Sequence, residues 1–134
     1  MPSAASAVDI RTLSAELDRL IAFGRGFPHP AGGAAWLDDR GHPDLSRPIH
    51  TWITARMAHV YCLSHLLGVA GAAELADYAL AGLTGLLRDR KFGGWYSSVM
   101  DGDAPDEKGC YAHAFVVLAA SSAVVAGRPE ADRL

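Results

Sequence analysis

The chain has 134 residues, half of them apolar and a fifth charged, with a formal net charge of −3. This length is typical of one domain, and the apolar share is large enough for a packed core, which excludes an intrinsically disordered chain. Its basic residues are scattered, so it lacks the basic surface of a nucleic-acid-binding protein, and we expect no nucleic-acid partner.

The apolar segments argue against a membrane protein. The most apolar run, residues 112–126, is 15 residues long and interrupted by two serines, whereas a spanning helix needs roughly 20 residues. Residues 1–6 lack the basic and apolar regions of a secretory signal. Cys62 and Cys110 form no metal-binding spacing, so we expect buried, reduced thiols in a cytoplasmic protein without a membrane partner.

Four helices are predicted along the chain from apolar spacing and from the glycines that follow them. The first runs from Asp9 to Phe23, and the others cover about residues 51–67, 72–88 and 109–126. The first and third are amphipathic, while the second and fourth are almost entirely apolar, as buried helices are. The predicted inward face of the first helix consists of Ile10, Leu13, Leu17, Leu20 and Ile21.

Short extended segments are predicted in the two long connections. Arg40-Gly41 follows two acidic residues and indicates a tight turn between short strands within residues 36–43. Residues 95–99 alternate as a strand does, and Asp101-Gly102 favours a small hairpin. The acidic residues 103–107 are typical of a solvated loop.

The two apolar helices form an internal repeat. Trp52 and Tyr111 begin them, and Gly68 and Gly127 end them, at the same offset of 59 residues. Each is followed by a short link and an amphipathic segment, and paired helices of this length are typical of helical repeat folds. Because the chain ends within the second such pair, we expect residues 1–134 to be the N-terminal portion of a larger single domain, or to be completed by a partner. An exposed apolar edge would then favour a homo-oligomer.

One polar stripe lies on the second predicted helix, where Trp52, Arg56 and His59 share a face. A guanidinium on a buried helix is costly unless it is paired or faces a wet cavity. Two interpretations of Arg56 follow: a structural arginine that meets a core carboxylate or a loop carbonyl, or part of a binding site.

Three motifs, residues 52–57, 90–96 and 108–115, resemble the N-acylglucosamine 2-epimerase superfamily in content, order and spacing, and most closely its mannose isomerase and sulfoquinovose isomerase branch. The resemblance implies an all-α fold, the N-terminal part of an (α/α)6 barrel. About four helices would form two αα-hairpin units with short β-hairpin loops, and a sugar would bind in the central cleft.

The resemblance also implies site residues. Arg56 and Tyr111 would hold sugar oxygens, and Trp52 would offer a flat apolar wall. Packing alone is the alternative role for Trp52 and for Tyr111. In this family a histidine removes the C2 proton of an open-chain aldose to give a cis-enediol, and no metal or organic cofactor is needed.

The histidines of the chain do not match the family's catalytic ones. The family's two catalytic histidines lie in later helical units, and His59, His65 and His113 occupy other positions. We therefore assign no catalytic residue within the chain and expect it to be inactive alone.

Three functions remain open. The Ile53-Thr54-Ala55-Arg56 segment favours an aldose–ketose isomerase acting on mannose, fructose or sulfoquinovose. The alternatives are a 2-epimerase of hexoses or N-acylhexosamines, and a non-catalytic fragment or assembly module.

Overall fold

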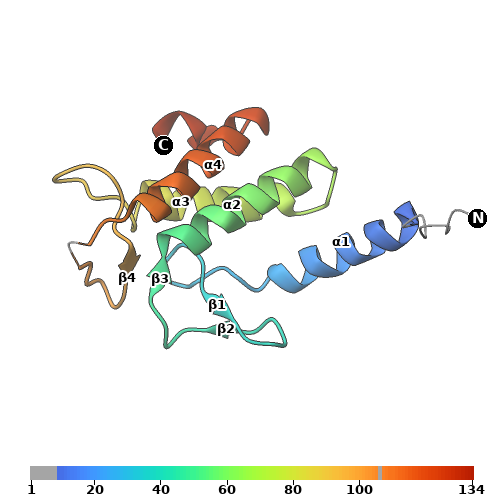
Figure 1. Cartoon of the computed structure of the whole chain (residues 1–134), viewed down its shortest axis with the longest axis horizontal. Coiled ribbons are helices and arrows are strands. Elements are labelled where there is room, and N and C mark those ends of the chain that lie inside the picture. The colour runs from blue at the N-terminus through green and yellow to red at the C-terminus, as the bar shows by residue number, and fades with distance from the viewer. Residues whose placement is uncertain (1–8, 106) are drawn as a thin grey trace, which may run out of the picture.

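Residues 9–105 and 107–134, which the computed structural model describes, form four α-helices and two small antiparallel sheets (Figure 1). The all-α fold predicted from the sequence is confirmed. The segment 1–6, which we expect to be no secretory signal, lies outside the described residues. The helices are α1 (Ile10–Gly24), α2 (Thr51–Leu66), α3 (Ala72–Thr84) and α4 (Cys110–Val125), and a 3-10 helix, η1 (Pro129–Arg133), follows them.

Four short strands occupy the two long connections. The strands are β1 (Trp36–Leu37), β2 (Pro43–Asp44), β3 (Ile49–His50) and β4 (Ser98–Val99). β1 and β2 form the hairpin predicted around Arg40-Gly41, with Trp36 opposite Asp44. The predicted turn at Asp101-Gly102 is closed by reciprocal backbone hydrogen bonds between the residues on either side of it. β4, however, pairs with the distant β3, with Ile49 opposite Val99.

Helix α2 is the centre of the packing. It lies against α3 and α4, while α1 extends away from them and meets α2 near its own C-terminal end (Figure 1). At that end the buried Tyr61 hydroxyl donates to the Ile21 carbonyl at 2.8 Å. The Phe27 ring packs on Tyr61 with centroids 5.4 Å apart. Leu80, Leu83 and Leu87 are fully buried beside them and complete the core.

Helix α3 is shorter than predicted, because it ends at Thr84 and not at Arg88. Gly85 leaves helical geometry at φ −108° and ψ −101°, and glycine loses the most backbone freedom when it is kept in a helix. The Leu87 N–H then donates to the Gly82 carbonyl at 3.1 Å. This turn keeps Leu87 in the core and brings Arg88 into a bridge with Trp95.

The apolar face of α1 was expected to pack on the core, and that expectation is wrong for most of the helix. Only Ile21 is buried. The remaining members of the face are between 43% and 77% exposed: Ile10, Leu13, Leu17 and Leu20. The spacing of the stripe was right, but α1 contacts α2 at one end, and most of the stripe is not covered by any other described helix.

The two cysteines differ in environment. Cys62 is buried on α2, and burial raises the pKa of its thiol to about 11. Cys110 is exposed at the first position of α4, so the expectation that both are buried is wrong. Among the described residues, no helix has both the length and the hydropathy needed to cross a bilayer.

The predicted repeat is present in the helix bounds. The starts of α2 and α4, Thr51 and Cys110, are 59 residues apart. Their ends, Leu66 and Val125, are also 59 residues apart. Arg128, after α4, makes a bidentate ion pair with Asp77 of α3, at 2.8 and 2.7 Å. The two helical pairs are therefore joined by a charged contact as well as by packing.

Candidate functional site

Three aromatic rings cluster where α2 and α4 begin. The Trp52 ring lies 6.1 Å from Tyr111 and 6.5 Å from Phe115, and Tyr111 lies 4.9 Å from Phe115, measured between centroids. Trp52 and Phe115 are half-buried, and Tyr111 is 62% exposed. Two residues from one helix and one from the other thus form a continuous, partly accessible aromatic surface.

Arg56 lies one helical turn beyond Trp52. Its guanidinium carbon is 5.5 Å from the Trp52 ring centre and 5.4 Å from that of Phe115, distances typical of cation–π contacts. The sequence placed Arg56 on a mostly buried helix, and its side chain is exposed. It forms no hydrogen bond or ion pair with any residue that the structure describes, so neither the core carboxylate nor the loop carbonyl of the structural interpretation is found.

A hollow of about 350 Å³ opens beside Trp52 and Arg56. Trp36 forms its far wall, with its ring nearly perpendicular to Trp52 at 5.9 Å. The indole Nε1 of Trp36 is buried and has no hydrogen-bond partner among the described residues. The lining is largely apolar and consists of Ala35, Trp36, Leu37, Trp52, Ile53, Arg56, Met57 and Val60. Tyr111 and Phe115 are not part of this lining and meet Trp52 from its α4 side.

Two guanidinium groups lie against the rings that line the hollow. The Arg47 guanidinium lies 5.0 Å from the Trp36 ring centre, and Arg56 lines the hollow itself. His50 packs edge-on against Trp36 at 5.6 Å, and burial lowers the pKa of its imidazole, which favours the neutral ring. Arg47 is paired with Asp44 at 3.1 Å, so among the described residues Arg56 supplies the unpaired guanidinium. An apolar wall with this guanidinium at its edge suits a neutral or anionic ligand that carries many oxygens.

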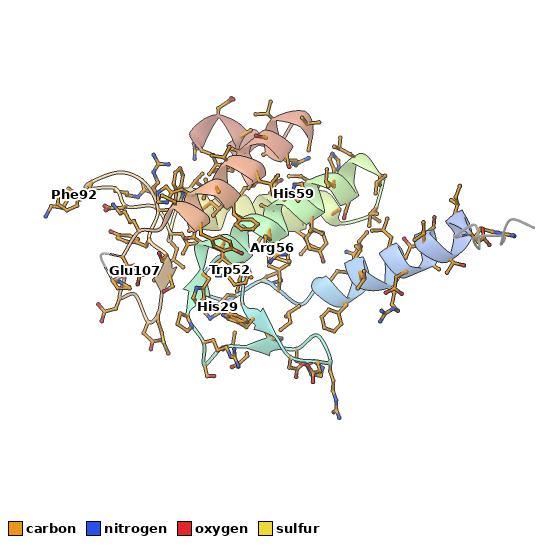
Figure 2. The ribbon with its side chains drawn as sticks, viewed as in Figure 1. His29, Trp52, Arg56, His59, Phe92 and Glu107 are labelled. Atoms are coloured by element: carbon orange, nitrogen blue, oxygen red, sulfur yellow. The ribbon has the colours of Figure 1, made fainter. Side chains whose placement is uncertain are left out.

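His59, the third member of the predicted stripe, points elsewhere. Figure 2 shows Trp52, Arg56 and His59 in succession along α2. The Nδ1 of His59 lies 2.6 Å from the Ser122 hydroxyl of α4, and Ser122 donates onward to the Leu118 carbonyl. His59 is thus a half-buried histidine satisfied between two helices.

The other two helical histidines also have structural partners. His65 Nε2 lies 3.4 Å from an Arg128 nitrogen. His113 Nδ1 donates to the Gly109 carbonyl at 2.8 Å, and its Nε2 accepts the Trp95 N–H at 3.2 Å. None of these histidines lines the hollow beside Trp52.

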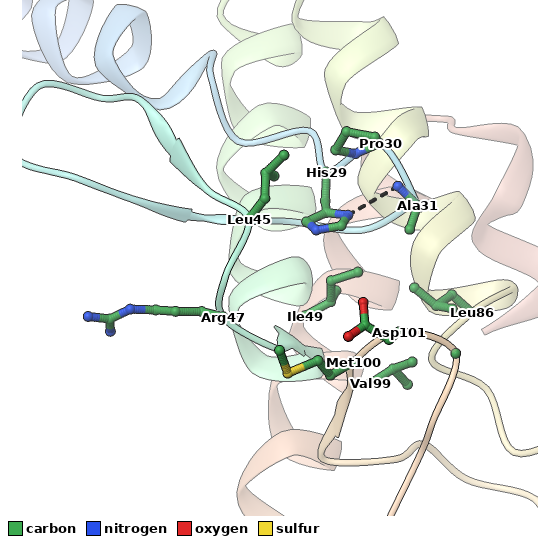
Figure 3. Close-up of a pocket in the computed structure, with 11 residues that line it drawn as sticks. His29, Pro30, Ala31, Leu45, Arg47, Ile49, Leu86, Val99, Met100 and Asp101 are labelled. Atoms are coloured by element: carbon green, nitrogen blue, oxygen red, sulfur yellow. Dashed lines mark hydrogen bonds between the residues drawn. The ribbon is translucent and has the colours of Figure 1, made fainter.

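A second hollow, of about 310 Å³, lies among the loops and was not predicted (Figure 3). His29 lines it, and its Nδ1 accepts the Ala31 N–H at 3.1 Å. Figure 3 shows the Asp101 carboxylate on the opposite side. The β3–β4 pairing creates this hollow, and no local pattern in the sequence indicates that pairing.

The structure brings together the three residues singled out from the sequence, Trp52, Arg56 and Tyr111, and adds two. Phe115 could have been found, since it lies four residues after Tyr111 on the same helix face. Trp36 could not, because strand β1, which carries it, reaches Trp52 only in the folded chain.

The chain is similar to known proteins over most of its length. The sequence model of the family described as "N-acylglucosamine 2-epimerase (GlcNAc 2-epimerase)" matches residues 32–134. A protein of Thermobifida fusca named "D-mannose isomerase" is 48% identical over 124 residues, which is 91% of this chain and 30% of that protein. A "D-mannose isomerase" of Pseudomonas cannabina pv. alisalensis is 42% identical over 122 residues, 91% of this chain and 29% of that protein.

The chain thus spans about three tenths of the length of these two relatives. The matched region contains the whole of the aromatic cluster, the hollow beside it and all three motifs recognised in the sequence. The chain belongs to the N-acylglucosamine 2-epimerase family, and it is similar to members named D-mannose isomerase.

Proposed function

We propose that this chain is the sugar-holding N-terminal part of an aldose–ketose isomerase that acts on a mannose-like hexose. One observation carries the proposal: the unpaired guanidinium of Arg56 stands against the Trp52 and Phe115 rings at the edge of a hollow of about 350 Å³. The names of the two relatives support the choice of sugar.

Each residue has a role that follows from its chemistry. The Trp52 ring presents a flat apolar surface to the C–H face of the sugar. Arg56 donates charge-assisted hydrogen bonds to sugar oxygens and stabilises negative charge that develops on an enediolate. The Tyr111 hydroxyl, on an exposed side chain, adds a donor and acceptor from α4.

The proton transfer itself requires a general base, and we propose that it comes from outside these residues. An imidazole near neutral pH suits removal of the C2 proton and its return to C1. No histidine lines the hollow beside Trp52 in the described part of the chain. In this proposal residues 1–134 are the first part of one (α/α)6-barrel domain, and the reaction proceeds through a cis-enediol without a metal or organic cofactor.

Epimerisation at C2 is the second candidate, because the matching family is described by a 2-epimerase. Both reactions share the enediol and differ in the carbon that regains the proton. Product analysis separates them, since isomerisation of D-mannose gives a ketose and epimerisation gives the C2-epimeric aldose. If neither product forms with the complete protein, a non-catalytic module remains.

Sugar binding by the chain is the first test. Saturation-transfer NMR with D-mannose and D-fructose should show contact between the sugar C–H groups and aromatic protons. We expect Arg56→Ala to weaken binding about tenfold, because charged hydrogen bonds to the sugar are lost. Arg40→Ala, at an exposed position of the β1–β2 turn, is the matched control and should leave binding unchanged.

Two results would contradict the proposal. In one, the sugars show no saturation transfer to the chain. In the other, Arg56→Ala and Arg40→Ala bind the sugar equally well while both keep the wild-type circular dichroism spectrum. Activity is tested separately, by ketose formation from D-mannose, and we expect none from residues 1–134 alone.

A further inference from the structure

A polar pocket of about 480 Å³, separate from both hollows described above, lies between the end of α3, the loop that follows it and η1. It is lined by Thr84, Arg88, Asp89, Arg90, Gly93 and Arg133. It shares no lining residue with the hollow beside Trp52. We name it the Arg88 pocket.

Arg88 is the unusual member of this pocket. Its guanidinium carbon lies 4.1 Å from the Trp95 ring centre. Its Nη1 is buried without a hydrogen-bond partner, and no carboxylate of the described residues pairs with it. A half-buried cation without an anion is costly, so the arrangement favours an anionic ligand.

The support beneath Arg88 is well ordered by hydrogen bonds. The Trp95 indole Nε1 donates to the Leu83 carbonyl at 2.8 Å, and the Trp95 backbone N–H donates to His113. The ring on which Arg88 stacks is therefore fixed to α3 and to α4. A guanidinium held in this way loses little freedom when it binds a ligand.

Two further guanidinium groups face the same pocket. Arg90 is exposed, and within residues 9–105 and 107–134 it donates only to the Thr84 carbonyl, at 3.3 Å. Arg133 makes a loose ion pair with Glu130 at 3.5 Å and remains 72% exposed. Each has N–H groups left to donate to a ligand.

The acidic groups nearby do not balance these three cations. Asp89 is buried and is already neutralised by Lys108, and it also accepts the backbone N–H groups of Lys91 and Phe92 at 2.8 and 3.0 Å. Glu130 is shared between Arg133 and the Thr84 hydroxyl. The pocket therefore carries a net positive charge.

We propose that the Arg88 pocket binds a phosphate group, either as inorganic phosphate or on a small phosphorylated molecule. Forked guanidinium donors match the oxygen geometry of a tetrahedral dianion. The polar lining and the three arginines are unsuited to an apolar ligand or to a metal cation. This site is independent of the proposed sugar site, so either can fail while the other stands.

Phosphorus NMR on the whole chain tests the proposal. Inorganic phosphate and glucose 6-phosphate are titrated at constant ionic strength with sodium chloride, and the shift and width of the phosphorus signal are followed. We expect saturable binding that Arg88→Met weakens about tenfold, because a charged hydrogen-bonding partner is removed. Arg90→Gln should weaken it less, and Arg19→Gln, on the exposed face of α1, is the matched control.

Every outcome has a meaning. Tighter binding of glucose 6-phosphate than of inorganic phosphate assigns the site to a phosphorylated molecule, and equal binding assigns it to free phosphate. If Arg88→Met loses its near-ultraviolet circular dichroism, that variant is misfolded. The proposal is then tested by whether Arg90→Gln binds phosphate more weakly than Arg19→Gln does. The proposal is overturned if phosphate does not bind, or if the pocket variants bind it as well as Arg19→Gln does.

Discussion

Asp89 is a buried acidic side chain held by three donors. Lys108 donates to its carboxylate, and the backbone N–H groups of Phe92 and Lys91 do the same. These bonds hold the pKa of the Asp89 carboxyl well below its usual range. Lys108 also donates to the Gly93 carbonyl at 2.7 Å, so the pair closes the loop of residues 89–94 against the start of α4.

This ion pair should make the protein sensitive to acid. Because the folded-state pKa of Asp89 is depressed, its stabilising effect is complete above the unfolded pKa of about 3.9 and is lost as the pH falls below it. We expect Asp89→Asn to lower the melting temperature at pH 7 and to flatten its decline between about pH 5 and pH 3. Thermal melts followed by circular dichroism measure both effects.

The exposed Asp39→Asn variant is the control for Asp89→Asn. If the two variants show the same pH profile, the interpretation of the Asp89–Lys108 pair as a stabilising contact is wrong.

The residues of the candidate site were predictable from the sequence only in part. Trp52 and Arg56 share a face because they are four residues apart, and the 59-residue repeat placed Tyr111 at the matching end of α4. The exposure of Arg56 was not predictable. It depends on which face of α2 remains uncovered by α3 and α4, and this is decided by contacts between helices.

Helix α3 comes close to the backbone of the loop before β1 at Gly82. A Cβ atom added at Gly82 would lie 2.6 Å from the Gly33 Cα and 2.8 Å from the Gly33 nitrogen. Gly33 itself has a φ of +70° and packs against Ile49 and Thr54. The loop before β1 therefore packs directly against the backbone of α3, because neither Gly33 nor Gly82 has a side chain.

We predict that Gly82→Ala destabilises the protein by about 1–2 kcal/mol, although alanine favours helices by about 1 kcal/mol, because overpacking outweighs the propensity gain. Urea unfolding measures the change. Ala81→Gly, at the exposed neighbouring position on α3, measures the effect of helix propensity alone and should lower the free energy of unfolding by about 1 kcal/mol. A gain in stability for Gly82→Ala would show that the loop moves aside.

Helix positions could be predicted more reliably than helix lengths. α2 and α4 begin and end where the apolar runs and their glycines indicate. α3 ends early because Gly85 lies within an otherwise unbroken apolar pattern, and periodicity alone does not show which glycine ends a helix.

Large apolar side chains remain exposed on α1, α2 and α4 in the part of the chain that the structure describes. Leu17 and Leu20 of α1, Leu63 of α2, and Val124 and Val125 of α4 are between 43% and 71% exposed. Exposed apolar side chains on several helices promote association between copies or with further protein.

We predict that the chain binds a hydrophobic dye and associates in a concentration-dependent manner, measured by fluorescence and by sedimentation velocity. The double variant Leu17→Glu and Val124→Glu should reduce both effects, because it places charge on two of the uncovered helices. Phe92→Glu is the control, since Phe92 is 75% exposed but lies at a loop tip away from these helices (Figure 2). A monomeric chain that binds no dye would contradict the prediction.

The pairing of β3 with β4 has a consequence for synthesis of the chain in the cell. Ile49 cannot meet Val99 until a ribosome has added the fifty residues from 50 to 99, which takes on the order of seconds. During that interval β4 does not yet exist, so Ile49 and His50 have no partner strand. The speed of translation across residues 51–99 therefore sets how long β3 remains unpaired.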